Sequence, residues 1–345
     1  MGMIIDREIT FEREGIMIRY QSKATDFVEN YSLLKAAFKW DHNLINYFGA
    51  LMAVGEKKQV DTEEIKEIRK YIKSNTTVFS QFRGMNELLV ALMIWLEPGA
   101  ERVFDRTIEI YDSLKDSGFK GGTYLPMAAI ILAKNETKKS VESMIFRMHE
   151  FYDGMKEQHF FLTGQDDYVF AALLAATELV PSTTLKLIED FYRDLHSNGF
   201  SKGNALQSLS HVLAIGDEPY DKKLEKTIRV NKAFTSKGYK FRDYTMSNLG
   251  VLALLTNDPE SLVDEVLEVS DWLKTQKGFG GFSLDKKTRT ILASSLIAYQ
   301  YMDDSEVTFE KAVLANSIQT LIIAQQVAMS AAVIAASAAA TSAST

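Results

Sequence analysis

Two adjacent aspartates, Asp166 and Asp167, form the carboxylate pair in this chain with the best prospect of acid–base chemistry. Enzymes that use two carboxylates as acid and base place them on opposite sides of the scissile bond, usually from different segments. Across a ring, Asp41, Asp243 or Asp285 could supply the opposing carboxylate, as in inverting glycosidases built on helical barrels. Nothing in the sequence selects one of these three partners.

Several other chemistries are not expected. Metal-dependent prenyl-diphosphate chemistry requires a third aspartate shortly after the pair, but residues 168–170 are Tyr, Val and Phe. The chain has five histidines, none at the i, i+4 spacing of a helical zinc site, and no cysteine, so we expect no metal and no cofactor. It contains no phosphate-binding loop, dinucleotide fingerprint or Gly-x-Ser-x-Gly elbow. A net charge of −7 argues against nucleic acid as a partner.

A larger set of polar side chains lies just before helices that the sequence predicts, where free backbone N–H groups favour polar or anionic ligands. Capping of the helix is the competing explanation for each residue taken singly. The candidate ligand-binding residues are Asp41, His42, Arg83, Glu87, Tyr124, Asp166, Asp167, Tyr168, Arg242, Asp243, Asp285 and Arg289.

The elements that must position these side chains follow from a repeat. Seven aromatic residues recur at intervals of 39 to 41 residues, and most of them open a glycine-rich or polar loop: Phe38, Phe79, Phe119, Phe160, Phe200, Tyr239 and Phe279. Such a period predicts an array of helical hairpins, with the aromatic residues packed as wedges between neighbours. Because each loop precedes a helix of the same kind, we expect all of the loops to gather on one rim.

Two further patterns define the helices of each unit. An apolar residue followed by alanine lies 14 or 15 residues after most of the aromatics, as in Met52-Ala53 and Leu252-Ala253, within a stretch rich in small residues. Prolines such as Pro181 and Pro259 then precede charged amphipathic stretches, as expected at a helix start. The difference between the stretches rich in small residues and the charged amphipathic stretches predicts an inner layer of closely packed helices and an outer amphipathic layer.

The predicted fold is therefore all-α: about seven helical hairpins with a period near 40 residues. We favour a closed α/α toroid over an open α-solenoid, because the first unit lacks the polar cap that an open array needs. The expected divisions are a lead-in helical segment at 1–37, a seven-unit repeat domain at 38–311 and a C-terminal helix at 312–345. Asp303 and Asp304 are expected in the turn before the last outer helix, as its N-cap.

The C-terminal segment, 312–345, carries no charged residue and is rich in alanine with a frayed end expected. A membrane span would need about twenty predominantly apolar residues, but glutamines and serines interrupt this one. A helix buried in the ring, or one that joins subunits into a homo-oligomer, explains the composition better. Contact with a membrane is not expected, and the acidic start of the chain lacks the apolar run of a signal peptide, which indicates the cytoplasm.

The motif Phe38-Lys39-Trp40-Asp41-His42, the loops Ser117-Gly118-Phe119 and 277–282 (Lys-Gly-Phe-Gly-Gly-Phe), and the alanine-rich end resemble an uncharacterised bacterial family, domain of unknown function 4003. That resemblance covers most of the chain and implies no activity. More distantly, the Gly-Phe-Gly-Gly-Phe loop is similar to the repeat of protein prenyltransferase β subunits and terpene cyclases, which are α/α toroids.

Two classes of function remain open. In the first, the protein binds a polar small molecule or a protein partner at the loop rim of the toroid. In the second, it is a hydrolase or transferase that acts on a carbohydrate or isoprenoid-like substrate through rim carboxylates. The sequence favours the first class, because no cluster of residues has the spacing that catalysis demands.

Overall fold

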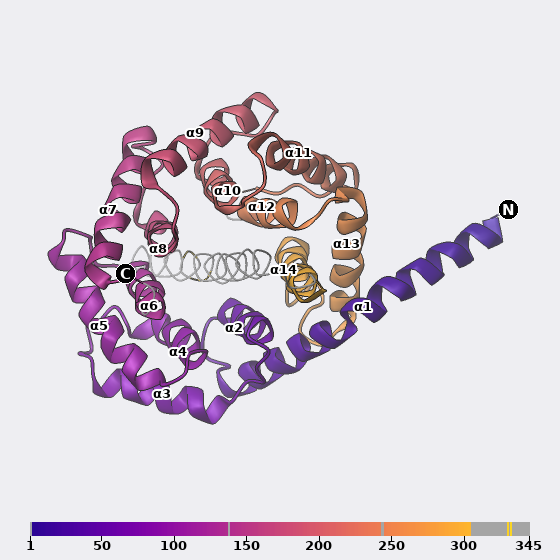
Figure 1. Ribbon diagram of the computed structural model, residues 1–345. Helices are drawn as coiled ribbons and strands as arrows, with labels where there is room; N and C mark the ends of the chain where they lie inside the picture. The colour runs from indigo at the N-terminus through magenta and orange to yellow at the C-terminus, as the bar shows by residue number, and fades with distance from the viewer. Residues whose placement is uncertain (1, 137–138, 243–244, 305–329, 331, 333–345) are drawn as a thin grey trace, which may run out of the picture.

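The structure is a computed structural model, and it describes residues 2–136, 139–242, 245–304, 330 and 332, with side chains from residue 17 onward. Within those ranges the chain forms 14 α-helices and two short 3-10 helices, with no strand. The prediction of an all-helical protein is confirmed. The helices alternate between an outer and an inner position around the molecule (Figure 1).

The odd-numbered helices lie outside. They are α1 (Gly2–Ala37), α3 (Thr62–Ser74), α5 (Ala100–Asp116), α7 (Val141–Gln158), α9 (Pro181–Ser197), α11 (Tyr220–Ser236) and α13 (Pro259–Thr275). The even-numbered helices lie inside. They are α2 (Asn43–Gly55), α4 (Glu87–Trp95), α6 (Leu125–Asn135), α8 (Tyr168–Ala176), α10 (Asn204–Ile215), α12 (Met246–Leu255) and α14 (Lys286–Asp304). The 3-10 helices η1 (Gly84–Asn86) and η2 (Gln165–Asp167) precede α4 and α8.

Burial explains the two positions. Inner helix α8 is buried at every residue from 168 to 175, whereas outer helix α3 buries only the stripe Ile65, Ile68 and Ile72. Small residues let the inner helices approach one another: a Cβ on Gly49 of α2 would lie 2.6 Å from Leu92 of α4. The predicted pairing of small-residue inner helices with amphipathic outer helices is confirmed.

Each outer helix packs most closely on the inner helix that follows it in the chain. The first hairpin is therefore α1 with α2, and the seventh is α13 with α14. Helix α1, expected only as a lead-in to the repeats, fills the outer position between α13 and α3, and its N-terminal end projects away from the other helices (Figure 1).

The recurring aromatic residues follow from how the outer helices end. At Gly118 and Gly199 the backbone has φ of +112° and +92°, a conformation that favours glycine. The next residue, Phe119 or Phe200, turns back so that its N–H donates to Leu114 or Leu195, and its ring is buried. This is a helix C-cap in which an apolar side chain covers the last turn.

Two of the seven aromatics do not act as wedges. Phe79 and Phe160 are exposed, at 91% and 64%. Neither follows a glycine, so the chain does not turn back onto the outer helix at these positions. In the second unit Phe82 is buried instead, against Phe104 and Tyr111.

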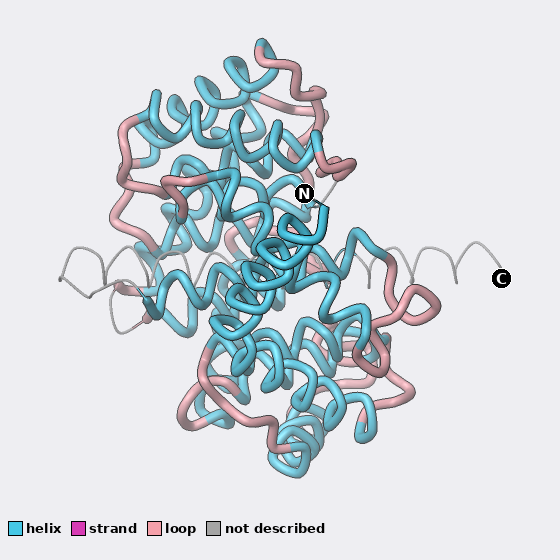
Figure 2. Tube along the Cα trace, turned by 90° about the vertical axis from the view of Figure 1, so that its right-hand side faces the viewer, coloured by secondary structure: helices cyan, strands magenta, loops and turns pink. Residues whose placement is uncertain are grey.

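Seven loops lead from an outer to an inner helix, and we call them together the loop rim: 38–42, 75–86, 117–124, 159–167, 198–203, 237–245 and 276–285. Most loops lie toward two opposite edges in Figure 2, with helices running between them. Neighbouring hairpins contact each other at or beside these loops. The contacts are the ion pairs of Arg69 with Asp41 and Glu87, the ring contact Phe82–Tyr111, the hydrogen bonds Lys120–Tyr168, Thr163–Gln207 and Tyr47–Gly278, and Lys286 over the ring of Tyr239. The fifth and sixth loops line one cavity. These contacts confirm that the loops gather on one side.

On the opposite side, basic side chains cap the C-terminal ends of inner helices. Lys58 Nζ donates to the carbonyl of Leu96 at 2.8 Å, and Arg147 donates to Leu179 at 2.6 Å. The buried Lys223 donates to Leu213 and Gly216 at 2.7 and 2.6 Å. Cations at helix C-termini satisfy free carbonyls and interact favourably with the helix dipole.

The first and last hairpins contact each other. Arg19 of α1 forms an ion pair with Asp304 at 2.8 Å, and Lys23 pairs with Asp303. Tyr20 donates a hydrogen bond to Glu265 of α13. Asp303 and Asp304 were expected in a turn, but they belong to α14 and bind cations of α1, so the N-cap assignment is wrong.

Most of the C-terminal segment 312–345 lies outside the described residues, and so do the predictions of its helix, its frayed end and its role in a homo-oligomer. Of this segment the structure describes Ser330, which is fully buried, and Ala332, which lines the cavity introduced below. A search of the described helices finds none long and apolar enough to cross a membrane.

Candidate functional site

A cavity of about 840 Å³ opens among the fourth, fifth and sixth loops of the rim. Its walls come from α8, α10, α11 and α12 together with those loops. The lining residues are Asp166, Asp167, Phe170, Gly199, Phe200, Ser201, Lys202, Gly203, Asn204, Ala205, Ser208, Asn231, Thr235, Lys240, Phe241, Arg242, Met246, Ser247 and Ala332.

The cavity lies where two inner helices separate. Helices α6 and α8 pack closely, as do α10 and α12, but α8 and α10 have far fewer contacts. Side chains bridge the gap: Gln207 Nε2 donates to Thr163 Oγ1 at 3.0 Å, and the rings of Phe170 and His211 lie 5.5 Å apart. In a regular repeat, α8 and α10 would pack against each other as the other neighbouring pairs do. The gap between them therefore distinguishes the contact between the fourth and fifth hairpins from the contacts on either side of it.

Asp167 is the most perturbed carboxyl group of the site. Its side chain is 5% exposed, and Oδ2 accepts a hydrogen bond from the Gly164 N–H at 2.9 Å. Burial, with a smaller contribution from the negative charge of Asp166, raises the pKa of Asp167 to about 8. The group therefore holds its proton in a large fraction of molecules at neutral pH.

Asp166 lies at the exposed mouth of the cavity and accepts a hydrogen bond from the side chain of Asn204 in the next unit. Tyr124 lies close to the two carboxyl groups: burial and then the charges of Asp166 and Asp167 raise its pKa to about 12. Within the part of the chain that the structure describes, no Lys, Arg or His forms an ion pair with either aspartate. No cation of the described residues therefore offsets the negative charge that this pair carries when it ionises.

Three basic side chains line the other walls: Lys202, Lys240 and Arg242, all exposed at the cavity mouth. The loop that carries Arg242 is fixed by Thr245, whose hydroxyl donates to the Arg242 carbonyl at 2.6 Å. Lys202 and Lys240 were not among the residues predicted from sequence. The available signal was their position directly after a Gly-aromatic turn, in Gly-Phe-Ser-Lys and Gly-Tyr-Lys.

Two predicted candidates are engaged in a structural ion network. Arg69 of α3 binds Asp41 at 2.9 Å and Glu87 at 2.7 Å, and Lys73 approaches Glu87 at 3.0 Å. Glu87 is 4% exposed. These carboxylates join the first and second hairpins, and they lie outside the residues that line the cavity.

His42 and Arg83 cap helices. His42 is the N-cap of α2, where Nδ1 accepts from the Leu44 N–H at 3.4 Å. The Arg83 guanidinium donates to Thr76 Oγ1 at 2.9 Å and to the Thr76 carbonyl, at the end of α3. His42 fits the capping explanation given above, whereas Arg83 binds the end of the preceding helix and makes no side-chain cap to η1.

The remaining candidates also have structural partners. Asp285 caps α14 by accepting from the N–H and hydroxyl of Thr288 at 3.0 and 2.6 Å. Arg289 is buried and donates to the carbonyls of Ser270, Phe279 and Leu284. The buried Tyr168 accepts from the Lys120 N–H at 3.3 Å.

Asp243 lies outside the described residues. Of the twelve predicted candidates, the structure brings Asp166, Asp167 and Arg242 to the cavity, with Tyr124 close behind them.

A histidine beside the bridge between α8 and α10 is buried without a described partner. His211 of α10 is fully buried, and neither ring nitrogen has a hydrogen-bond partner among the described atoms. Burial lowers the pKa of His211 to about 3, so the ring is neutral. A search of the described residues for three or more His, Asp or Glu side chains that could hold a metal ion finds no such group.

Comparison with known proteins places this chain in a family. Residues 30–327 match the family model described as a protein of unknown function, DUF4003. The chain belongs to this family. It is also similar to the uncharacterized protein YeaA of Bacillus subtilis (strain 168), with 29% identity over 324 residues that cover 92% of this chain and 95% of YeaA. No solved structure matches the chain. The resemblance proposed from sequence is confirmed, and neither comparison supplies an activity.

Proposed function

We propose that this DUF4003 protein is a closed α/α toroid that binds a polar ligand carrying both a cationic and an anionic group in the cavity of the loop rim. Ring closure is supported by the contacts of α1 and α2 with α13 and α14. The Tyr47 hydroxyl donates to the Gly278 carbonyl, which joins the first loop to the seventh. An open solenoid would leave both terminal hairpins without these partners.

The observation that carries the ligand proposal is the arrangement of charge in the cavity. Asp166 and Asp167 form one wall, and Lys202, Lys240 and Arg242 lie on others. A buried carboxyl group without a cation is stabilised by any ligand that brings a positive charge to it. The basic side chains would bind a carboxylate or phosphate on the same molecule.

The size and openness of the cavity limit the ligand. A volume of about 840 Å³ falls within the range of roughly 300–1,000 Å³ that small-molecule sites occupy. Amino acids, short peptides and phosphorylated amines combine the two charges at this size. The hydroxyl and amide groups of Ser208, Asn231 and Thr235 supply further hydrogen-bonding positions on the walls.

The pKa of Asp167 gives the proposal a testable signature. Below about pH 8, a ligand cation that binds the ionised carboxylate must first displace its proton. The affinity for an amine ligand should therefore rise with pH, by up to about tenfold per pH unit, until the pH reaches the pKa. Binding should release protons into solution.

The experiment is a thermal-shift screen of amino acids, dipeptides, polyamines and phosphorylated amines, followed by calorimetry of any hit in two buffers of different ionisation enthalpy. We expect Asp167→Asn to weaken binding and to abolish its pH dependence. Asp271→Asn, which removes an exposed carboxylate on α13, is the matched control and should bind normally. A ligand that binds elsewhere, or binds equally well to Asp167→Asn at all pH values, would refute the proposal.

One observation favours the alternative, a hydrolase or transferase. A carboxyl group with a pKa of about 8 beside an ionised one is an arrangement that can donate and accept protons at neutral pH. In that case Asp167 would be the general acid, and the charge of Asp166 beside it would help to keep its pKa raised. Product formation from carbohydrate or isoprenoid-like substrates, lost in both Asp166→Asn and Asp167→Asn, would support catalysis, whereas unchanged ligand recovered after incubation would support binding alone.

A further inference from the structure

Exposed aromatic side chains are concentrated on the loop rim. Among the described residues, eleven large hydrophobic side chains are exposed, and seven of them lie in the loops of this rim. They are Trp40, Val78, Phe79, Met85, Phe160, Phe161 and Phe282. The short turns on the opposite side hold Val180 alone from this set. Burial in the fold does not account for these residues, because the rings project from the loops.

The most exposed rings come from four different hairpins. Trp40 is 90% exposed, Phe79 is 91% exposed, Phe161 is 96% exposed, and Phe282 has no contact that shields it. They lie in the first, second, fourth and seventh loops. The seventh, first and second loops follow one another around the molecule, so Phe282, Trp40 and Phe79 lie on neighbouring loops, and Phe161 lies on the fourth loop.

The same face is basic although the protein is acidic. The loops of the rim contain eight lysines and arginines against five aspartates, a formal charge of +3, whereas the whole chain carries −7. The basic residues are Lys39, Arg83, Lys120, Lys202, Lys237, Lys240, Arg242 and Lys277. All of them except Arg83 are exposed.

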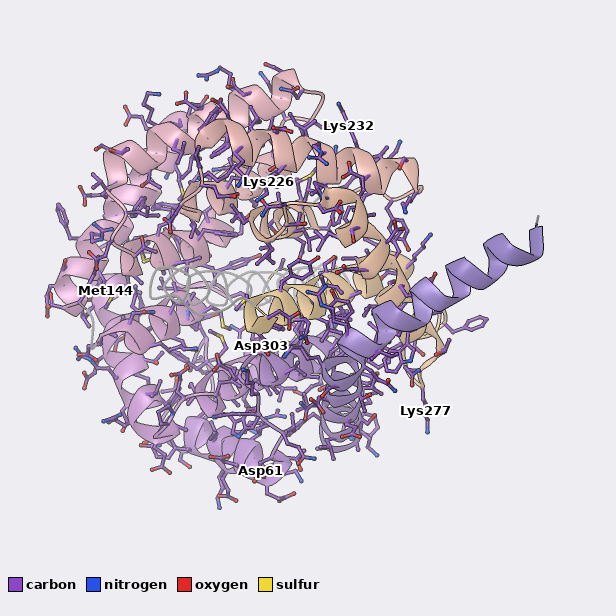
Figure 3. All side chains as sticks on the ribbon, turned by 45° about the vertical axis from the view of Figure 1, so that its right-hand side comes forward. Asp61, Met144, Lys226, Lys232, Lys277 and Asp303 are labelled. Atoms are coloured by element: carbon purple, nitrogen blue, oxygen red, sulfur yellow. The ribbon has the colours of Figure 1, made fainter. Side chains whose placement is uncertain are left out.

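The opposite turns have the reverse charge. The six segments that lead from an inner to an outer helix (56–61, 96–99, 136–140, 177–180, 216–219 and 256–258) contain four lysines against eight aspartates and glutamates, a formal −4. The charge therefore changes sign from one side of the molecule to the other. Figure 3 labels Lys277 of the seventh loop, which points away from the body of the protein.

We propose that the loop rim docks on the surface of an anionic lipid bilayer, with the exposed aromatic rings inserted at the headgroup level. Aromatic side chains favour the membrane–water interface, and lysines around them bind anionic headgroups. Lys39 lies over the ring of Trp40 at 5.1 Å, and Lys156 lies over Phe160 at 5.6 Å. These two rings are thus each accompanied by a cation that can reach a phosphate as the ring enters.

The distribution of the rings favours a bilayer over a protein partner. A protein interface of ordinary size has a contiguous apolar core surrounded by a polar rim. Here the exposed rings come from four separate loops, and three of these loops also carry a basic residue: Lys39, Arg83 or Lys277. A flat, fluid and negatively charged surface can accept several separate rings at once. This proposal reverses the expectation of no membrane contact, which considered the C-terminal segment and not the loop tips.

The four rings lie outside the cavity, although Lys202, Lys240 and Arg242 belong both to the basic face and to the cavity lining. The test is co-sedimentation of the full chain with vesicles of phosphatidylcholine containing about one-third phosphatidylglycerol, against vesicles of phosphatidylcholine alone. We expect binding to the anionic vesicles only, with an affinity that falls steeply as salt is added. The fluorescence of Trp40 should shift to the blue when vesicles bind, and this shift should disappear in Trp40→Phe while binding persists.

Variants identify the face. Phe161→Ala combined with Phe282→Ala should lower partition to anionic vesicles by at least about tenfold, since two inserted rings are lost. Phe146→Ala is the matched control, because Phe146 is 66% exposed but lies on outer helix α7. All of these side chains are exposed, so melting temperatures should not change. Failure to bind anionic vesicles at low salt, or equal loss of binding in Phe146→Ala, would overturn the proposal.

Discussion

Replacing Asp167 with asparagine should change how the stability of this protein depends on pH. The carboxyl group has a pKa of about 8 in the folded protein, against a usual value of 3.8 in an unfolded chain. Between these values the folded state binds one proton more than the unfolded state. The free energy of unfolding of the wild-type protein should therefore fall as the pH rises from about 4 to about 8.

The size of the effect follows from the same two values. A difference of about four pH units, at 1.36 kcal/mol for each, sets an upper limit of about 5 kcal/mol on the stability lost. Water can enter the open cavity when Asp167 ionises, so we expect roughly 2 kcal/mol or more. Asparagine keeps the hydrogen bond from Gly164, which spans 2.9 Å in the wild type, and cannot ionise.

The assay is urea unfolding followed by circular dichroism at a series of pH values and fixed ionic strength. Asp167→Asn should be more stable than the wild type at about pH 8 and nearly equal to it at about pH 4. Asp166→Asn should retain part of the pH dependence, because burial outweighs the neighbouring charge as a cause of the raised pKa. If the wild type and Asp167→Asn show parallel pH profiles, the assignment of the raised pKa to this residue is wrong.

Three further predictions concern other parts of the protein. His211→Leu removes two buried ring nitrogens that lack partners, so the free energy of unfolding should rise by about 1–3 kcal/mol, and part of the stability that the wild type loses below about pH 6.5 should be retained, as measured by acid titration. Arg69→Met leaves Asp41 and Glu87 without their shared cation, so urea unfolding should show a loss of about 3–5 kcal/mol, and wild-type stability would contradict the network. Gly118→Ala places a side chain at φ +112° and should lower stability by about 1–2 kcal/mol in the same assay, whereas an unchanged midpoint would show that the turn relaxes.

The sequence predicted those features of the fold that the same local pattern produces in every hairpin. The period near 40 residues arises because an outer helix, a turn, an inner helix and a second turn recur with nearly constant length. The aromatic marks a helix C-cap where it follows a glycine, as at Phe119 and Phe200, and it failed as a marker of buried wedges where the preceding residue is Val78 or His159. The gathering of the loops on one side follows directly from the hairpin arrangement.

The candidate site was less predictable because it depends on exceptions to the repeat. Whether a carboxylate of the loop rim is free to bind a ligand depends on whether a cation from another helix pairs with it. Arg69 forms an ion pair with Asp41, but no described cation pairs with Asp166. Arg289 was also predicted to bind a ligand, yet its guanidinium donates to one carbonyl group on α13 and two in the seventh loop. The opening between α8 and α10 is a property of packing over long distances in the chain, and no local pattern records it.

The contact between α1 and the last hairpin has a consequence for synthesis of the protein. Arg19 and Asp304 are 285 residues apart, so the partner of the first helix is among the last parts of the described chain to leave the ribosome. At roughly 5–20 residues per second, α1 waits about 15–60 s for α13 and α14 to be made. During that interval the hydroxyl of Tyr20 and the side of α1 that faces α13 have no native neighbour. Nascent chains that stall or end before α14 should therefore expose the face of α1 that normally packs on the last hairpin. We expect such chains to bind chaperones or to associate with a second nascent chain.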